Sequence, residues 1–249
     1  MNVESESNLP AIDLDISALL LDVDGTILDI APVPGGVQMP PGLIDNIEIL
    51  REKTAGALAF LSGRTIKNLD TLFSPLVLPA VGDHGAEVRL PNGTVQHDVP
   101  MPTKVKARFE ELAALDPRII FEDKTYSVAL HYRLAPEFAG HLMDAARERV
   151  AEVPELNLTI LNGHAVLEIK RAGMSKGTGL SELMALAPFE GRKPYFAGDD
   201  RTDEDALAVL PQFGGVGISV GAHLQGARFM VRRPDQMRQW LARLAGQEE

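Results

Sequence analysis

Short apolar runs recur along this chain, and they constrain its fold more than any other feature of the sequence. The first run, Ala18-Leu19-Leu20-Leu21, ends in acidic residues and a glycine, as is typical of a strand buried on both faces of a parallel sheet. Similar runs follow at 57–61, 77–81, 193–197 and 215–220. Helical spacing of apolar residues separates several of them, at 43–53, 65–73, 175–186 and 203–210. Strands that alternate with helices predict an open α/β sheet with right-handed crossovers.

The middle of the chain has a different pattern. Helical spacing at 103–115 precedes two strand candidates, and a second helical stretch at 137–153 precedes two more. A helix followed by two strands, repeated twice, predicts a small antiparallel sheet with helices packed on one face. We therefore expect residues 98–171 to form an α+β cap inserted into a parallel-sheet core, which comprises residues 15–97 and 172–249.

The charge balance limits the partners that the chain can bind. Lys and Arg together number 24 against 35 Asp and Glu, which gives a net charge of -11. Such a chain repels nucleic acid and anionic membranes unless it carries a basic patch, and the sequence has no basic run. It also has no cysteine, which excludes disulfides and thiolate zinc sites.

The N-terminus lacks the features of an export signal. Residues 1–14 are polar and acidic, without a basic n-region or an apolar h-region, and we expect them to be disordered. No apolar stretch approaches the ~20 residues of a membrane-spanning helix. We therefore expect a cytoplasmic monomer that has neither nucleic acid nor membrane as a partner.

The strongest chemical signal follows the first apolar run directly. Asp22 and Asp24 stand two residues apart and precede Gly25-Thr26. The carboxyl end of a strand in a parallel sheet opens onto the crevice where ligands bind. One carboxylate can attack there while the other exchanges a proton with the leaving oxygen, and Gly25 allows a sharp turn whose amide can face a phosphate oxygen. The simpler interpretation is that acidic residues and glycine merely end a strand.

A second acidic cluster follows the run that ends at residue 197. Asp199, Asp200 and Asp203 lie close together in the sequence, and their charges repel one another unless a cation lies between them. Mg²⁺ takes oxygen ligands in octahedral geometry, whereas the spacing lacks the glycine and terminal glutamate of a calcium-binding EF-hand. We therefore predict a magnesium site that includes these residues. Thr202 or Asp203 could instead cap the helix that follows, but capping does not explain Asp199.

Two further segments supply groups that bind phosphate. Ser62-Gly63-Arg64 follows the second apolar run and offers a hydroxyl and backbone amides at a helix start. Lys176 opens a helix after the insertion, where its ammonium can neutralise a transferring phosphoryl group. Ser62 as a helix N-cap and Lys176 as a solvated surface residue are the structural alternatives. Because Lys176 occurs together with the other motifs, we favour the interpretation that it binds phosphate.

Together, these four segments resemble the four sequence motifs of the haloacid-dehalogenase-like phosphatases, in the same order. Asp24 matters within that superfamily, because its transport ATPases carry a different residue there and its dehalogenases lack the proton-transferring aspartate. The resemblance therefore implies a phosphatase or a phosphomutase.

Seven segments resemble the trehalose-6-phosphate phosphatases in particular, over residues 18–240. They are DVDGT at 22–26, SGR at 62–64, GDHGAE at 82–87, ALHYR at 129–133, LEIK at 167–170, SKG at 175–177 and GDDRTDE at 198–204. The resemblance implies a Rossmann-like core with an inserted α+β cap. It also implies Mg²⁺-dependent hydrolysis of trehalose 6-phosphate to trehalose and phosphate, a step of trehalose biosynthesis.

The same resemblance implies roles for the core residues. Asp22 would be the nucleophile that forms an aspartyl-phosphate, and Asp24 the general acid and then the base. Ser62, Gly63 and Lys176 would hold the phosphoryl group. Asp22, the Asp24 carbonyl and Asp199 would hold the metal, and the acidic cluster adds Asp200 and Asp203 to that set.

A third group of residues would contact the sugar and line the cleft. It consists of Arg64, His84, Glu122, Lys124, Arg133 and Glu168. Cap closure would exclude water and present Glu168 and Arg133 to the sugar. For Glu122 and Lys124 a solvated strand face is the alternative, and His84 could be a structural histidine.

Two other functions compete with this prediction. The first keeps the chemistry but changes the substrate to sucrose phosphate, mannosylglycerate phosphate or a hexose phosphate. The second is a non-catalytic sugar-phosphate sensor on a degenerate phosphatase fold. Degeneration would remove one of the four residues Asp22, Asp24, Lys176 or Asp199, and all four are present.

Overall fold

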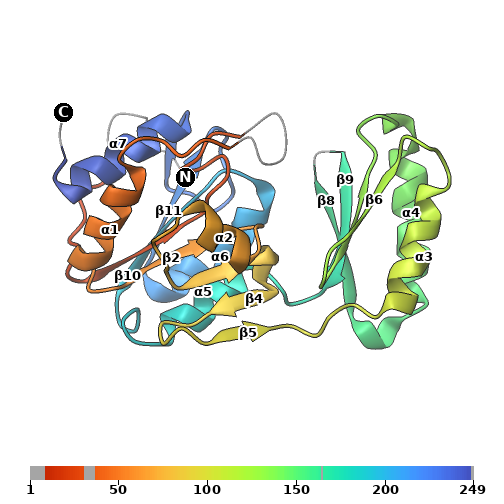
Figure 1. Ribbon diagram of the computed structural model, residues 1–249, viewed down its shortest axis with the longest axis horizontal. Helices are drawn as coiled ribbons and strands as arrows, with labels where there is room; N and C mark the ends of the chain where they lie inside the picture. Colours follow the sequence, from red (N-terminus) through yellow and green to blue (C-terminus); the bar gives the residue numbers. More distant parts are fainter. Residues whose placement is uncertain (1–8, 31–36, 164, 248–249) are drawn as a thin grey trace. The chain divides into compact units, whose positions relative to one another are not determined.

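The computed structural model describes residues 9–30, 37–163 and 165–247, which divide into two compact units (Figure 1). The core unit lies before Asp98 and after Met174, and the cap unit is Asp98–Met174. The predicted fold class, an α/β parallel-sheet core with an inserted α+β unit, is confirmed. Each unit has its own apolar core and is described by itself below.

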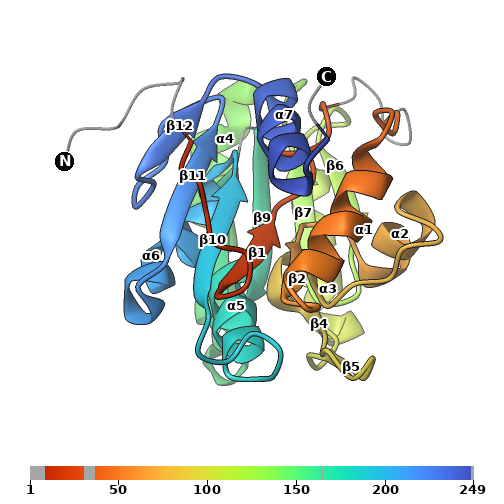
Figure 2. The same ribbon diagram turned by 90° about the vertical axis from the view of Figure 1, so that its left-hand side faces the viewer.

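The core unit is built on an eight-stranded sheet in the order β12-β11-β10-β1-β2-β3-β4-β5. The strands are β1 (Ser17–Leu21), β2 (Leu58–Leu61), β3 (Ala80–Gly82), β4 (Glu87–Arg89), β5 (Val95–His97), β10 (Lys193–Gly198), β11 (Val216–Val220) and β12 (Phe229–Val231). The strands from β12 to β3 are parallel, and β4 and β5 are antiparallel. Figure 2 shows β11, β10, β1 and β2 side by side in this order. Strand order reverses at β1. In α/β folds, ligands bind at the carboxyl ends of the strands beside such a reversal.

Helices cover both faces of this sheet because its strands are apolar on both sides. The helices of the core unit are α1 (Leu43–Lys53), α2 (Ile66–Leu72), α5 (Lys176–Met184), α6 (Glu204–Val209) and α7 (Pro234–Ala245), with the 3₁₀ turns η1 (Asp83–Gly85), η4 (Arg201–Asp203) and η5 (Leu210–Phe213). Leu19 and Leu21 of β1 pack with α1, α2 and α7, whereas Ala18 and Leu20 pack with α5 and α6. This alternation is the period of two that a strand imposes on its side chains.

Two parts of the core unit differ from the sequence prediction. The strand expected at 77–81 begins only at Ala80, and Val77 is 57% exposed, because Pro79 lacks the amide hydrogen that a ladder needs. In the second part, residues 9–14, which we expected to belong to a disordered tail, Leu9, Ile12 and Leu14 pack against the core and the Trp240 indole donates a hydrogen bond to the Pro10 carbonyl at 3.1 Å. Residues 1–8 of the expected disordered tail lie outside the described residues.

The cap unit is a four-stranded antiparallel sheet with two helices on one face (Figure 1). Its elements are α3 (Thr103–Ala113), β6 (Ile120–Asp123), β7 (Val128–His131), η2 (Pro136–Phe138), α4 (Ala139–Ala151), η3 (Pro154–Leu156), β8 (Leu158–Gly163) and β9 (Val166–Arg171), with strand order β6-β7-β9-β8. Leu130 and Leu167 pack under Phe109 and Leu142 of the helices. Among the described residues of this unit, no helix packs against the opposite face of the sheet.

Over the described residues, no helix combines the length and the apolar character that crossing a bilayer requires. The cytoplasmic location and the monomeric state expected from the sequence stay predictions.

Candidate active site

A polar cavity of about 360 Å³ lies in the core unit at the carboxyl ends of β1, β2 and β10. It is lined by Asp22, Asp24, Ser62, Gly63, Arg64, His84, Lys176, Asp199, Asp200 and Thr202. The structure therefore brings together residues that lie up to 180 positions apart in the sequence but all end or follow strands of one sheet edge. The predicted catalytic, phosphate-binding, metal-binding and cleft residues of the core unit all line this cavity except Asp203, which is buried beside it.

Asp22 is held at the end of β1 by two hydrogen bonds. The Lys176 ammonium donates to Asp22 Oδ1 at 2.7 Å and to Asp203 Oδ1 at 2.6 Å, and the Thr26 hydroxyl donates to Asp22 Oδ2 at 2.7 Å. Lys176 is 3% exposed, which excludes the alternative of a solvated surface lysine. Burial lowers the pKa of this ammonium, but the carboxylates of Asp22 and Asp203 outweigh burial and hold the pKa above its usual value. We predicted no role for Thr26 from the sequence, although it lies inside the first motif.

Three carboxylates converge at this place. Oxygens of Asp22, Asp199 and Asp203 lie within 4.8 Å of one another. Gly25 permits the approach, because its φ is +82° and a Cβ there would lie 2.0 Å from Asp199 Oδ2. Burial, and then the charge of Asp22, raise the pKa of Asp199 to about 9 and that of Asp203 to about 7. These three carboxyl groups lie beside a single ammonium, that of Lys176. They form a set of hard oxygen donors with excess negative charge, which fits a divalent cation such as Mg²⁺.

The other two residues of the predicted metal set have different side-chain partners. Asp200 Oδ1 accepts from the amide and the hydroxyl of Thr202, at 2.7 Å and 2.6 Å, and caps η4. The Asp24 carboxylate pairs with Arg64. Both side chains line the cavity but lie outside the cluster of three carboxylates. Asp203 Oδ2 accepts from the amides of Asp199 and Asp200, so Asp203 shapes the loop as well as contacting Lys176.

The residues that follow β2 form another part of the cavity lining. Ser62 is buried, and its hydroxyl accepts a hydrogen bond from the Arg64 amide at 3.1 Å. It does not cap α2, because Thr65 does so by accepting from the Asn68 amide. A Cβ on Gly63 would lie 2.5 Å from the His84 ring, so this glycine lets the ring reach the cavity.

His84 reaches this position through a strained turn. Asp83 and His84 have φ values of 44° and 53°, a left-handed conformation that residues other than glycine rarely adopt. A Cβ on Gly85 would lie 2.5 Å from backbone atoms of Ser175, so the turn packs tightly against the start of α5. The carboxylate of Glu87, in the same motif, accepts from the Ile66 amide at 2.7 Å and fixes the start of α2.

The predicted sugar-binding residues of the cap unit lie on or beside its sheet. Glu122 of β6 pairs with Ala129 of β7, which in turn pairs with Glu168 of β9. The two glutamates therefore share the sheet face that carries no helices. Glu168 Oε1 accepts from the Ser127 hydroxyl at 2.8 Å and from the Lys124 ammonium at 3.4 Å. Arg133 follows β7 and is exposed.

Two residues of this face were missed by the sequence analysis. Ser127 contacts Glu168, and His131 Nε2 lies 2.8 Å from Glu122 Oε2. His131 lies in the segment at 129–133 that resembles the family. Its contact with Glu122 depends on the pairing of β6 with β7, which the sequence does not reveal.

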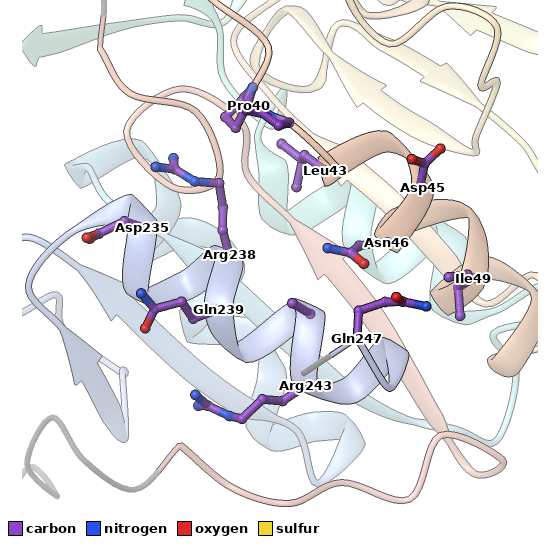
Figure 3. A pocket seen from close by; sticks show the side chains of 13 residues that line it. Pro40, Leu43, Asp45, Asn46, Ile49, Asp235, Arg238, Gln239, Arg243 and Gln247 are labelled. Atoms are coloured by element: carbon purple, nitrogen blue, oxygen red, sulfur yellow. The ribbon is translucent and has the colours of Figure 1, made fainter. Parts of the chain in front are cut away.

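A larger cavity of about 1100 Å³ lies beside α1 and α7 (Figure 3). Its polar side chains do not converge, since Gln239 and Arg243 point away from Asn46. Two of its charges have partners elsewhere, because Arg238 pairs with Asp29 at 3.2 Å and Asp235 pairs with Arg233 at 2.9 Å. We therefore assign the chemistry to the smaller cavity.

The architecture defines a fold class. A parallel-sheet core with an inserted α+β cap is the fold of the haloacid-dehalogenase-like superfamily. A phosphatase of that superfamily from Bacteroides thetaiotaomicron superposes with a TM-score of 0.65 at 18% identity, over 98% of this chain and 100% of the other. The C-terminal domain of trehalose-6-phosphate phosphatase from C. albicans superposes with a TM-score of 0.81 at 21% identity, over 94% of each chain.

Sequence comparison narrows the class to one family. The family model for trehalose-phosphatase matches residues 20–229. Trehalose-6-phosphate phosphatase of Escherichia coli K12 is 36% identical over 229 residues, which cover 90% of this chain and 85% of that protein. A probable trehalose-phosphate phosphatase of Sinorhizobium fredii is 38% identical over 214 residues, or 84% of this chain and 79% of that protein. The chain belongs to the trehalose-phosphatase family, a family of phosphoric monoester hydrolases, and the resemblance seen in the sequence is confirmed.

The raised carboxyl pKa values predict how stability depends on pH without metal. Asp199 and Asp203 bind protons more tightly in the folded chain than in the unfolded chain, where each has its usual pKa near 3.8. The folded state therefore holds more protons above about pH 4, and the free energy of unfolding should fall as pH rises from 5 to 9. Urea unfolding in the presence of a chelator measures this slope. An Asp199→Asn variant should show a shallower slope, and an unfolding free energy that rises over this range would contradict the prediction.

Proposed function

We propose that this chain hydrolyses trehalose 6-phosphate to trehalose and phosphate, with Mg²⁺ as cofactor and an aspartyl-phosphate as intermediate. The observation that carries the proposal is the buried pair of Asp22 and Lys176 at the end of β1, in a chain of the trehalose-phosphatase family. A carboxylate fixed beside a buried ammonium is oriented for attack on an anion that the same ammonium attracts.

In the first step, an oxygen of Asp22 attacks the phosphorus atom. A bond forms between that oxygen and phosphorus while the bond from phosphorus to the sugar oxygen breaks, and Asp24 donates its proton to the departing sugar oxygen. Lys176 offsets the charge of the phosphoryl oxygens, and the Ser62 hydroxyl and the Gly63 amide bind them.

In the second step, water releases the phosphate. Asp24, now a carboxylate, takes a proton from a water molecule that attacks the phosphorus atom. The bond between phosphorus and Asp22 breaks, and Asp22 returns to its starting form. The contacts of Asp22 with Thr26 and Lys176 support this role, because they restrict its carboxylate to one orientation through both steps.

The cluster of three carboxylates supports the choice of cofactor. Asp22, Asp199 and the Asp24 carbonyl would hold Mg²⁺, and Asp203 would support them from behind, where it already accepts three hydrogen bonds. When bound, the ion supplies positive charge that offsets the transferring phosphoryl group. Asp200 contributes through its cap on η4 and through its negative charge, since Thr202 already occupies one of its carboxylate oxygens.

The cap unit would select the sugar. Glu122, Lys124 and Glu168 offer carboxylates and an ammonium on one sheet face, which suits the many hydroxyls of a disaccharide. Arg133 adds an exposed guanidinium just after β7. His84 lines the cavity of the core unit, where it could contact the substrate next to the phosphoryl group.

A phosphate-release panel tests the substrate and the cofactor together. We expect kcat/KM for trehalose 6-phosphate to exceed that for sucrose phosphate, mannosylglycerate phosphate and hexose phosphates by more than about tenfold, which corresponds to ~1.4 kcal/mol of transition-state binding. A chelator should abolish release and added Mg²⁺ should restore it. A tenfold preference for another sugar phosphate would contradict the substrate, and full activity with chelator would contradict the cofactor.

A further inference from the structure

We infer that Arg64 is a positioning residue, which orients the Asp24 carboxyl group for proton transfer through a two-point hydrogen-bonded pair. This inference rests on the proposed function, because it assigns Arg64 to the general acid of that reaction. It replaces the role in sugar contact that the sequence predicted for Arg64.

The geometry of the pair is that of a guanidinium fork on a carboxylate. Arg64 Nε donates to Asp24 Oδ2 and Arg64 Nη2 donates to Asp24 Oδ1, each at 2.6 Å. Two parallel bonds fix the plane of the carboxyl group, which a single bond would leave free to rotate. The side chains are 25% and 37% exposed, so the pair lies at the mouth of the cavity and not in its buried floor.

The backbone of Arg64 is itself anchored to the phosphate side of the cavity. Its amide donates to the Ser62 hydroxyl at 3.1 Å, and its carbonyl accepts from the Asp83 amide at 2.8 Å. On the other side of the pair, the Gly25 amide donates to the Leu28 carbonyl at 2.8 Å and closes the loop that carries Asp24. The fork therefore connects the loop after β1 to the loop after β2, and it sets the proton-transferring carboxyl relative to the phosphoryl pocket.

Arg64 cannot transfer the proton itself. A guanidinium stays protonated at every pH at which proteins fold, and the hydrogen bonds with Asp24 raise its pKa further. Each carboxyl oxygen of Asp24 accepts one bond from the fork and keeps a second lone-pair direction for the transferred proton. Arg64 can thus affect the proton transfer through Asp24 in two ways, by its positive charge and by the orientation that the fork gives the carboxyl group, and a substitution that keeps the charge isolates the orientation.

The leaving group shows whether a residue acts through the proton transfer. A sugar alkoxide must be protonated as it departs, whereas 4-nitrophenolate is stable enough to leave without a proton. The value of kcat/KM covers the steps up to the first irreversible one, which is phosphoryl transfer to Asp22. A residue that orients the general acid should therefore affect kcat/KM for the sugar phosphate far more than that for 4-nitrophenyl phosphate.

The test uses Arg64→Lys, which keeps the positive charge but cannot form the fork. General acid catalysis contributes about 10²–10⁴-fold, and losing the orientation should remove part of this. We expect kcat/KM for trehalose 6-phosphate to fall about 10- to 100-fold, and that for 4-nitrophenyl phosphate to fall less than about threefold. In an Asp24→Asn background the same substitution should cause no further loss with trehalose 6-phosphate.

Because the two substrates are compared within one preparation, partial unfolding cancels from the ratio. Arg238→Lys is the matched control, since Arg238 also pairs with an aspartate of the core unit but lies outside the cavity, and it should leave both values unchanged. Equal losses on both substrates, a loss that persists in the Asp24→Asn background, or full activity of Arg64→Lys would each overturn the inference. If the unchanged chain prefers another sugar phosphate, that substrate replaces trehalose 6-phosphate, so a wrong substrate is distinguished from a wrong role for Arg64.

Discussion

The Asp22→Asn variant should release phosphate from trehalose 6-phosphate at least about 10⁴-fold more slowly than the unchanged chain. An amide has the same shape as the carboxylate but is too weak a nucleophile to form the aspartyl-phosphate. The loss should appear in kcat with 4-nitrophenyl phosphate as well, because the attack itself is removed and not the protonation of the leaving group. Phosphate release with saturating Mg²⁺ measures the effect.

The same variant should stay folded without metal. Asp22 contributes to the crowding of negative charge around Asp199 and Asp203, so its neutralisation relieves repulsion while Asp203 still pairs with Lys176. The thermal midpoint in chelator should therefore be no lower than that of Asp144→Asn, a matched change at an exposed position of α4. Near-normal phosphate release by Asp22→Asn would rule out this nucleophile.

The sequence predicted the sheet edge well because the information is local. A strand buried on both faces needs a continuous apolar run, and the polar residue that ends the run falls at the same edge in every parallel strand. For this reason Asp22, Ser62 and Asp199 could be expected together before any contact was known. The hairpin of β4 and β5 was missed because its strands are short, and Val95–His97 is half-exposed or exposed, without an apolar run to mark it.

The sequence could not predict which side chains that follow different strands contact one another. Asp199 and Asp200 are adjacent and chemically identical, yet one faces Asp22 and the other caps η4, because the turn after β10 directs them apart. Arg64 and Asp24 belong to different motifs, so their pairing depends on the register of β1 and β2. Nothing in either motif distinguishes an arginine that orients a carboxyl group from one that contacts a sugar.

Removal of the Lys176 ammonium should have the largest combined effect on stability and activity. In Lys176→Met, Asp22 and Asp203 keep their burial but lose a partner that lies 2.7 Å from one and 2.6 Å from the other. Uncompensated buried charge of this kind costs about 3–5 kcal/mol. We therefore expect the unfolding free energy in chelator to fall by about that amount, and kcat with Mg²⁺ to fall at least about 10²-fold, because the phosphoryl charge also loses its ammonium.

The pH dependence of that loss separates charge from packing. Acidification protonates Asp203, whose pKa is raised to about 7, and a neutral carboxyl group no longer needs an ammonium beside it, so the deficit of Lys176→Met in urea unfolding should shrink as pH falls toward 4. A packing defect would leave the deficit constant. Lys67→Met, an exposed lysine on α2, provides the control and should change stability by less than about 0.5 kcal/mol. If Lys176→Met is as stable as Lys67→Met at pH 8, then the buried ammonium does not hold the carboxylates together, and the electrostatic basis proposed for the site is wrong.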